Sequence, residues 1–282
     1  MLENIYFSLC TVSCYTRLMK IHHFITPCRI NGNNLTIIDT NIVHHMNNVI
    51  RLRAGEVVRI CPPAGEAVTD GLYYDITLDV VSKKEITGTI NSKGIIPMFE
   101  NKVTLVMSII KGSNFDLVIQ KATELGVDRI VPVVSERTIK KDVNMPRIQT
   151  IAREAAEQSE RMTVPTIDEP ISFTKWAEQE HSGDVYFFDT YTESRASNLV
   201  NIDSTRHDFA KSTARHDSAE SPVNSKLSTV NYVVIGPEGG WSPAEQKIAE
   251  ENNWHVYSTD ANILRAETAA IVGTYLAVKG TL

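Results

Sequence analysis

The junction on which the fold depends reads Val233-Val234-Ile235-Gly236-Pro237-Glu238-Gly239-Gly240-Trp241-Ser242-Pro243-Ala244-Glu245. Its apolar, β-branched beginning predicts a buried strand. Its end predicts a helix, because a serine N-cap, a proline at the first helical position and a glutamate at the third form a capping box. The glycine-rich turn between them therefore lies where open α/β sheets bind ligands.

The glycines of this turn are Gly236, Gly239 and Gly240. They permit backbone angles that other residues disfavour, and they let a ligand approach the main chain closely. Many strand-to-helix turns carry two glycines and bind nothing. Three glycines with a proline and an acid within five residues favour a ligand-binding loop over such a turn.

A second stretch follows, Ile263-Leu264-Arg265-Ala266-Glu267-Thr268-Ala269-Ala270, in which an apolar pair and an arginine open an alanine-rich helix. Glu267 lies in the first helical turn, where a negative charge suits the helix dipole. Taken alone, the stretch favours a capped core helix with Arg265 as a surface charge.

Together, these two stretches resemble, in order and spacing, the cofactor loops of the ribosomal RNA uridine-N3 methyltransferases, the RsmE-type family of the SPOUT superfamily. Lys121-Ala122-Thr123-Glu124-Leu125-Gly126-Val127 and Glu154-Ala155-Ala156-Glu157-Gln158-Ser159 also look like family segments. The resemblance runs from about Met19 to the C-terminus.

The resemblance implies an α/β protein with an N-terminal PUA-like β-barrel that grips RNA, followed by a SPOUT α/β domain with a C-terminal trefoil knot. It also implies a homodimer whose active site lies at the subunit interface, and S-adenosyl-L-methionine as the cofactor. The implied reaction is methylation of N3 of a uridine in 16S ribosomal RNA near the decoding site, in the small ribosomal subunit.

Composition sets further bounds. The 282 residues are 42% hydrophobic, with a formal net charge of −6, so a general affinity for nucleic acid is not expected and RNA binding needs a local basic patch. The four cysteines have no metal-ligand spacing, and we expect a reduced, cytoplasmic protein without a bound metal. No apolar run approaches the length of a membrane span.

The chain divides into three parts. Residues 1–18 are expected to be an N-terminal extension, and Met19 is an alternative start. Residues 19–95 are expected to form the PUA-like domain, with strands over 35–38, 57–60, 72–81 and 85–90, a helix over 41–52, and a linker over 91–101. Residues 96–282 are expected to form the methyltransferase domain.

In this second domain strands and helices alternate, which predicts a parallel sheet. A serine- and threonine-rich segment, 193–230, is too poor in large apolar residues to fold and is expected to be a flexible insertion. The last helix is apolar all round, which is typical of a helix packed in a core or at a dimer interface. The strands are expected over 103–110, 130–134, 185–188, 233–235 and 254–257, and the helices over 115–126, 147–161, 243–253 and 267–278.

The candidate RNA-binding residues are His44, Arg51, Arg53, Lys111 and Lys121. The two arginines flank Leu52 before a turn, where both can face a phosphate backbone. They are equally well explained as solvated cations at a helix end. Lys111 follows a strand end, and an exposed loop lysine is the simpler interpretation of it.

The cofactor is expected among backbone amides and carbonyls of three loops at strand ends. Apolar Ile235 and Leu264 are expected to flank its adenine. One departure from the family pattern is Asp260-Ala261-Asn262, which stands where a glycine is expected; asparagine tolerates the left-handed geometry. The candidate residues are Asp189, Thr190, Ile235, Gly236, Pro237, Glu238, Gly239, Gly240, Asn262, Ile263, Leu264, Arg265, Thr268 and Ala269.

Two residues are candidates for catalysis. Loss of the N3 proton of uracil puts negative charge on the flanking carbonyl oxygens, and Arg265 is the first candidate to stabilise it. Glu238 is the candidate general base, although an ordinary carboxylate is a weak base for this proton. Holding the loop by bonding its amides is at least as good an interpretation of Glu238, and capping the helix is that of Glu267 and Thr268.

Three other functions stay open. One is a knotted methyltransferase that acts on another rRNA or tRNA nucleotide, and another is a non-catalytic RNA-binding protein of ribosome assembly. An NTP-binding enzyme is disfavoured, because the chain has no phosphate-binding Gly-Lys-Ser/Thr signature.

Overall fold

The computed structural model describes residues 21–63, 71–96, 102–189, 230–257 and 263–282. These residues belong to two compact units, which divide between Ile95 and Ile96. The expected N-terminal extension, 1–18, lies outside the described residues, as does the expected insertion up to residue 229. The structure therefore tests the predictions for the two units and not those for these two segments.

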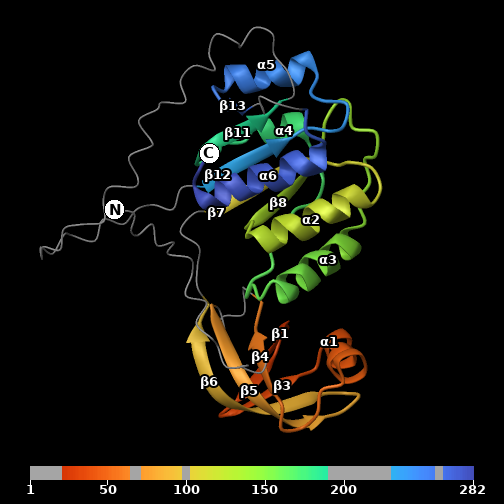
Figure 1. Ribbon diagram of the computed structural model, residues 1–282, viewed down its shortest axis with the longest axis vertical. Helices are drawn as coiled ribbons and strands as arrows, with labels where there is room; N and C mark the ends of the chain where they lie inside the picture. The colour runs from red at the N-terminus through yellow and green to blue at the C-terminus, as the bar shows by residue number, and fades with distance from the viewer. Residues whose placement is uncertain (1–20, 64–70, 97–101, 190–229, 258–262) are drawn as a thin grey trace, which may run out of the picture. The chain divides into compact units, whose positions relative to one another are not determined.

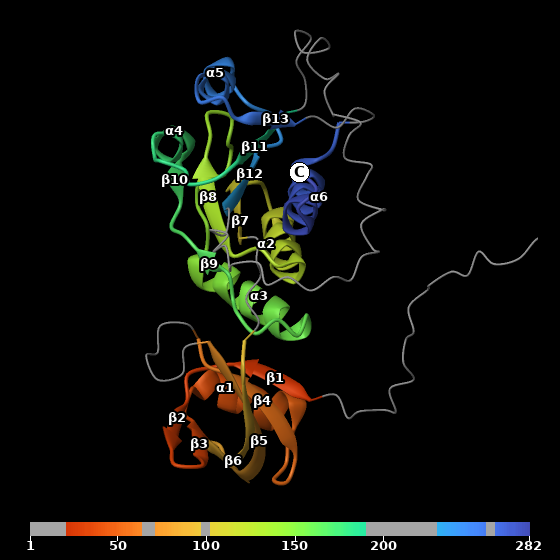
Figure 2. The same ribbon diagram turned by 90° about the vertical axis from the view of Figure 1, so that its left-hand side faces the viewer.

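The described residues of the N-terminal unit form a six-stranded sheet, and among its described pairs only β1–β4 is parallel. Alternate strand residues such as Leu35, Ile37, Ile76 and Leu78 are buried and make one apolar core with α1. The order across the sheet is β1(His22–Ile25), β4(Val57–Cys61), β5(Leu72–Val81), β6(Ile86–Ile95), β3(Asn34–Ile37) and β2(Arg29–Asn31) (Figure 1; β2 is labelled in Figure 2).

Two predictions for this unit need correction. The helix expected over 41–52 is a short α-helix, α1(Thr40–His44), continued by a π-helix, η1(His45–Ile50), and it ends at Arg51 with φ 64°. The linker expected over 91–101 begins later, because β6 continues to Ile95. Cross-strand polar bonds explain the longer strand: Asn91 Nδ2 donates to Thr77 Oγ1 at 2.8 Å, and Ser92 Oγ donates to Asp75 at 3.2 Å.

Strands β1 and β2 were not predicted. Each is short, and β1 forms by pairing in parallel with β4, more than thirty positions along the chain. Such a long-range pairing leaves no local period in the sequence. Residues 97–101 of the expected linker lie outside the described part of the chain.

The C-terminal unit contains a seven-stranded sheet in which every described pair is parallel, as predicted. The order is β10(Ile171–Ser172), β8(Arg129–Val134), β7(Lys102–Ser108), β12(Val230–Ile235), β11(Val185–Phe188) and β13(His255–Tyr257), with β9(Thr166–Ile167) also paired to β8. The two-residue strands β9 and β10 were not predicted, because so short a segment has no readable period.

Helices cover both faces of this sheet, as Figures 1 and 2 show. One face carries α2(Ser113–Leu125), α3(Met145–Gln158) and α6(Ala266–Lys279), and the other carries α4(Phe173–Ala177) and α5(Pro243–Glu251). Alternate residues of one strand serve the two cores: Val233 and Ile235 of β12 face α2 and α6, whereas Val234 faces the aromatic core of α4 and α5. Helix α4 was not predicted.

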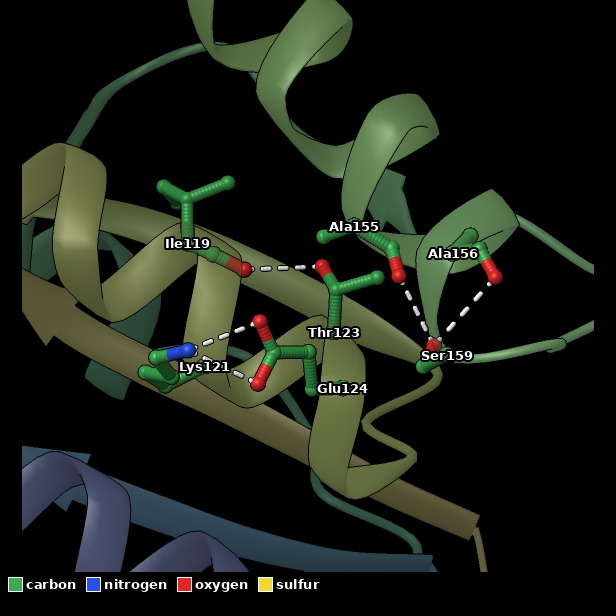
Figure 3. Close-up of polar contacts among 7 residues, drawn as sticks. All are labelled: Ile119, Lys121, Thr123, Glu124, Ala155, Ala156 and Ser159. Atoms are coloured by element: carbon green, nitrogen blue, oxygen red, sulfur yellow. Dashed lines mark hydrogen bonds and ion pairs between the residues drawn. The ribbon is translucent and has the colours of Figure 1, made fainter.

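Polar side chains in the helical layer satisfy carbonyls of their own helices (Figure 3). In α2, the buried Thr123 hydroxyl donates to the Ile119 carbonyl at 2.8 Å. At the end of α3, the Ser159 hydroxyl donates to the Ala155 carbonyl at 2.8 Å. Both helices therefore pack without leaving these hydroxyls unpaired.

Helix α6 is apolar on most sides, and the described part of the chain fully buries one of them. The buried residues are Ala270, Gly273, Thr274 and Ala277, whereas Tyr275 is 49% exposed. The prediction left a core and a dimer interface open, and the described residues leave part of the α6 surface, at Tyr275, exposed.

Candidate functional site

A cavity of about 610 Å³ lies at the carboxyl ends of the parallel strands β11, β12 and β13. This is within the volume range of small-molecule sites and at the edge of the sheet where such sites form. Its lining residues come from five segments far apart in the chain: Asn114; Arg137; Phe188 and Asp189; Ile235, Gly236, Pro237, Glu238, Gly239, Gly240, Trp241 and Gln246; and Tyr257, Ile263, Leu264, Arg265, Ala266, Glu267 and Ala269.

The glycine loop, residues 236–240, leaves the end of β12 and turns sharply. The Gly240 N–H donates to the Pro237 carbonyl at 2.9 Å, and Gly240 has φ 68°, a conformation that favours glycine. At Gly236 the reason for glycine is space: an added Cβ would lie 2.9 Å from Trp241 Cε2. The loop therefore folds back against its own tryptophan.

Trp241 anchors the loop to the neighbouring strand. Its Nε1–H donates to the Phe188 carbonyl at the end of β11, at 2.8 Å, and the ring stacks on Phe187 with centroids 4.6 Å apart. The side chain is buried. The indole thus packs its apolar ring in the core while its N–H bonds the end of β11, and both contacts fix this part of the cavity wall.

Helix α5 begins with the predicted capping box, which is confirmed. The Ser242 side chain accepts from the Glu245 N–H at 3.4 Å, and Glu245 Oε2 accepts from the Ser242 N–H at 2.9 Å. The helix N-terminus therefore lies directly after the glycine loop, and its dipole favours electronegative groups there.

Loops that follow β7 and β8 hold the glycine loop from its other side. The Lys111 N–H donates to Glu238 Oε1 at 3.0 Å, and Arg137 Nη1 donates to the Gly239 carbonyl at 3.0 Å. The Glu238 carboxylate is exposed. The first bond ties Glu238 to the loop after β7, which is the contact expected from the second of the two interpretations given to it from sequence.

The start of α6 also lines the cavity. Arg265 is its N-cap residue, and the arginine side chain is 85% exposed, with Nη1 4.0 Å from Glu267 Oε1. Glu267 is almost buried and also accepts from Asn114 Nδ2 at 3.3 Å. Glu267 thus links the start of α6 to the start of α2, while the Arg265 guanidinium stays accessible.

Asp189 closes the cavity at the end of β11. Its Oδ2 accepts from Gln246 Nε2 of α5 at 2.7 Å, and its N–H donates to the Tyr257 carbonyl at 3.0 Å. The carboxylate is therefore held in one orientation beside the glycine loop.

The structure brings together most of the residues that the sequence assigned to the cofactor. Eleven line the cavity, and Thr268 is exposed on α6 and does not. Thr190, Asn262 and the unusual Asp260-Ala261-Asn262 segment lie outside the described residues. Those that line it are Asp189, Ile235, Gly236, Pro237, Glu238, Gly239, Gly240, Ile263, Leu264, Arg265 and Ala269.

Several lining residues were not among the predicted ones. Trp241 and Gln246 stand within a few positions of the glycine loop, so a wider window around the capping box would have found them. Asn114 and Arg137 follow strand ends, but they carry no local signal that points to this cavity. The full set is Asn114, Arg137, Phe188, Trp241, Gln246, Tyr257, Ala266 and Glu267.

The RNA candidates of the N-terminal unit are exposed. His44 Nδ1 lies 2.8 Å from Asn48 Nδ2, Arg51 has the left-handed backbone noted above, and the Arg53 N–H donates to Glu56 at 2.8 Å. A stronger cationic feature of this unit was missed. Arg59 forms two bonds with Asp75, at 2.6 and 2.9 Å, and lies 4.2 Å from the Tyr73 ring centroid.

Asp75 and Arg59 form a structural ion pair rather than free RNA ligands. The hydrogen bond from Arg59 holds the pKa of Asp75 below its usual value. The two candidates in the C-terminal unit differ. Lys121 is paired within α2 with Glu124 at 2.8 Å (Figure 3), whereas Lys111 is exposed beside the glycine loop.

The described residues contain no cluster of three or more side chains that is able to hold a metal ion. A search of the same residues finds no helix of the length and apolarity that a membrane crossing needs.

A parallel sheet covered by helices on both faces, with a glycine loop and a helix N-terminus around a cavity at its carboxyl edge, defines the class of α/β proteins that bind a small molecule there. Residues 97–277 match the family model of the RNA methyltransferase domain. The chain belongs to this family, and within it to the ribosomal RNA small subunit methyltransferase E proteins.

Relatives and solved structures agree on this assignment. The chain is 26% identical to ribosomal RNA small subunit methyltransferase E of Rickettsia conorii, over 90% of this chain and 93% of the relative. It is 31% identical to that of Mesomycoplasma hyopneumoniae, over 61% and 67%. A crystal structure of this enzyme from Neisseria gonorrhoeae, bound to S-adenosyl methionine, is similar with a TM-score of 0.67 at 27% identity, covering 90% and 95%.

Proposed function

We propose that the protein is a cytoplasmic methyltransferase that uses S-adenosyl-L-methionine to methylate N3 of a uridine in 16S ribosomal RNA near the decoding site. One observation carries the proposal. The glycine loop and the Ile263–Arg265 segment, separated by more than twenty positions, line the same cavity, and the Arg265 side chain there is exposed. Membership of the RNA methyltransferase family supports the class of reaction.

The cavity fits the proposed cofactor. Its volume suits a nucleoside with an amino-acid chain, and its walls combine backbone amides of the glycine loop with the apolar side chains of Ile235 and Leu264. Asp189, fixed by Gln246, offers a carboxylate for hydroxyl or amino groups. Bound S-adenosylmethionine supplies the electrophilic methyl group.

Arg265 is proposed to stabilise the negative charge that develops on the uracil oxygens as N3 loses its proton. Its guanidinium is exposed and only weakly tied to Glu267, at 4.0 Å, so it is free to contact a base. The backbone of Arg265 is fixed, because its carbonyl accepts the Ala269 N–H at 2.9 Å. A charged hydrogen-bond donor that is carried by a fixed backbone suits electrostatic stabilisation of a transition state.

Glu238 is proposed to shape the glycine loop first, through the Lys111 N–H. A role as the general base requires that this exposed carboxylate be released from that bond or covered by the RNA. The role as a loop holder requires neither change, and the contact supports it.

The finer features of the architecture are also proposals. The exposed part of the α6 surface supports a homodimer in which a second copy covers it. The N-terminal sheet is proposed to be a PUA-like barrel that binds RNA through His44, Arg51 and Arg53, with Lys111 and Lys121 contacting RNA in the methyltransferase domain. A C-terminal trefoil knot, through which the last strand and helix thread, is proposed as well.

The experiment combines labelled S-adenosylmethionine with small ribosomal subunits that lack the modification, followed by mass spectrometry of the nucleosides. We expect 3-methyluridine in 16S rRNA. Methylation of another nucleoside would contradict the proposed target and leave the proposed cofactor in place. If the protein binds the cofactor but transfers no methyl group, either to small subunits or to free rRNA, the result would favour a non-catalytic assembly protein.

A further inference from the structure

Glu245 makes one bond more than helix capping requires. Its side chain is 5% exposed, and Oε2 accepts the Ser242 N–H, which completes the capping box. The other oxygen, Oε1, accepts the N–H of Glu136 at 2.9 Å. Glu136 lies in the loop that follows β8, 109 positions earlier in the chain, so one buried carboxylate joins two loops.

The loop that Glu245 holds contacts the glycine loop through the next residue. Arg137 Nη1 donates to the Gly239 carbonyl at 3.0 Å. The two also pack closely, because a Cβ added at Gly239 would lie 3.3 Å from Arg137 Cβ. A shift of the Glu136 backbone therefore moves Arg137 and the wall of the cavity.

We propose that Glu245 is a positioning residue for the cofactor cavity, acting through Glu136 and Arg137 on Gly239. The inference rests on the proposed function, because it takes S-adenosylmethionine as the molecule that the cavity binds. Bonds from backbone N–H groups to a carboxylate are stronger than neutral ones, and a buried N–H that loses its acceptor is costly. The carboxylate therefore keeps both loops in one arrangement before the cofactor binds.

The variants separate positioning from capping. Glu245→Gln keeps the size of the side chain but gives it only one acceptor oxygen, so one of the two N–H groups loses its partner. Ser242→Ala weakens the same cap from its other half and leaves both bonds to the carboxylate. Arg137→Ala removes the contact with Gly239 together with one side chain that lines the cavity. Arg137→Lys keeps a cation and restores one donor, and Arg153→Ala, on the exposed side of α3, is a control for loss of an arginine.

The first measurement is the Kd for S-adenosylmethionine by calorimetry on the full chain. We expect about a tenfold rise for Glu245→Gln and for Arg137→Ala, the size expected from one lost hydrogen bond. Arg137→Lys should recover part of it, and Ser242→Ala and Arg153→Ala should change the Kd less than about twofold. The double variant Glu245→Gln/Arg137→Ala should be no weaker than either single one, because both act through one path.

The second measurement is hydrogen exchange without ligand, with the glycine loop and residues 135–138 followed. Glu245→Gln should speed exchange in both loops, and Ser242→Ala should speed it only at the start of α5. Equal effects of Glu245→Gln and Ser242→Ala in both measurements would reduce Glu245 to a helix cap and overturn the inference. A wild-type chain that does not bind S-adenosylmethionine would instead remove the proposed function, and the exchange pattern would still decide whether Glu245 joins the loops.

Discussion

The same two strands, β11 and β13, border a cavity at each of their ends. At the carboxyl ends lies the glycine-loop cavity, and at the amino ends lies a cavity of about 810 Å³ between α4, α5 and the residues that precede each strand. The first is lined largely by backbone and by side chains whose bonds are described above. The second contains the acids Glu178, Glu180 and Asp184 and the imidazole of His181.

The two cavities differ in how their polar groups are satisfied. At the carboxyl end, the lining carboxylates of Glu238 and Asp189 each accept a hydrogen bond of 3.0 Å or less from another loop or helix. At the amino end, His181 Nε2 is buried without a hydrogen-bond partner among the described residues. A cavity whose walls are tied across several loops is preorganised for a ligand, and the comparison therefore favours the carboxyl end as the functional one.

The largest expected effect comes from Arg265→Ala. It should lower the methyl-transfer rate about 10²- to 10³-fold, the usual loss on removing a group that stabilises transition-state charge. The Kd for S-adenosylmethionine should change little, because the Arg265 side chain is 85% exposed and its backbone, held by the Ala269 N–H, stays in place. Single-turnover transfer to small ribosomal subunits and calorimetry measure the two quantities.

Arg153→Ala, with its exposed side chain on α3, is the matched control and should transfer methyl groups at the wild-type rate. A full rate in Arg265→Ala would remove this residue from the mechanism. A large loss of cofactor affinity would assign it to binding instead.

The next effect is that of Gly236→Ala. The added Cβ would lie 2.9 Å from Trp241 Cε2 and 3.0 Å from Nε1, so the indole, held by the Phe188 carbonyl, has to move. We expect about a tenfold rise in the Kd for S-adenosylmethionine, as for a loss of about 1.4 kcal/mol. Gly239→Ala is the matched change in the same loop, with its nearest contact at 3.3 Å, and should cost less. A larger rise in Kd for Gly239→Ala than for Gly236→Ala would mean that the position of Trp241 does not determine the shape of the cavity wall.

The glycine loop was predictable because all its signals are local. The strand, the turn and the capping box stand within thirteen consecutive residues, each with its own physical requirement. The parallel sheet was predictable for the same reason, since its longer strands and helices each have their own period. The family resemblance added the second wall, Ile263–Arg265, which composition and spacing alone had left as an ordinary helix start.

What the sequence did not show depends on contacts between distant positions. The bond from Arg137 to Gly239 joins residues 102 positions apart, and the bond from Asn114 to Glu267 joins residues 153 apart. Neither arginine nor asparagine has a pattern that marks such a partner. The same holds for β1, whose four residues become a strand only beside β4. Local propensity leaves these choices open, and tertiary packing decides them.

A third change compares how much the tryptophans at the two ends of β11 contribute to the stability of the fold. Trp241→Phe keeps an aromatic ring in the core but leaves the Phe188 carbonyl without its 2.8 Å donor. We expect the free energy of unfolding to fall by about 1–3 kcal/mol, from the unpaired carbonyl and the smaller ring. Urea denaturation measures it. Trp254, in the amino-end aromatic cluster, is only half-buried, so Trp254→Phe should lower the free energy of unfolding by less. A larger loss for Trp254→Phe would mean that the tryptophan at the amino end stabilises the fold more than Trp241 does.

The smallest effect concerns His181 and the amino-end cavity. Its ring stacks on Trp176 with centroids 4.3 Å apart, and burial lowers the pKa of the imidazole from its ordinary value, although three acids line the same cavity. The folded chain therefore disfavours the protonated form. Its stability is complete above the unfolded pKa of about 6.5 and falls as the pH drops toward the folded pKa.

His181→Phe keeps a stacked ring and removes both the titration and the unpaired nitrogen. The variant should lose less stability than the wild type between pH 7 and pH 5, by under about 1 kcal/mol, since the imidazole is only half-buried and solvent screens its charge. Urea denaturation at several pH values measures the difference. If the free energy of unfolding depends on pH equally in both proteins, His181 gains a hydrogen-bond partner on protonation. The polar groups of the amino-end cavity would then be as well paired as those of the carboxyl-end cavity.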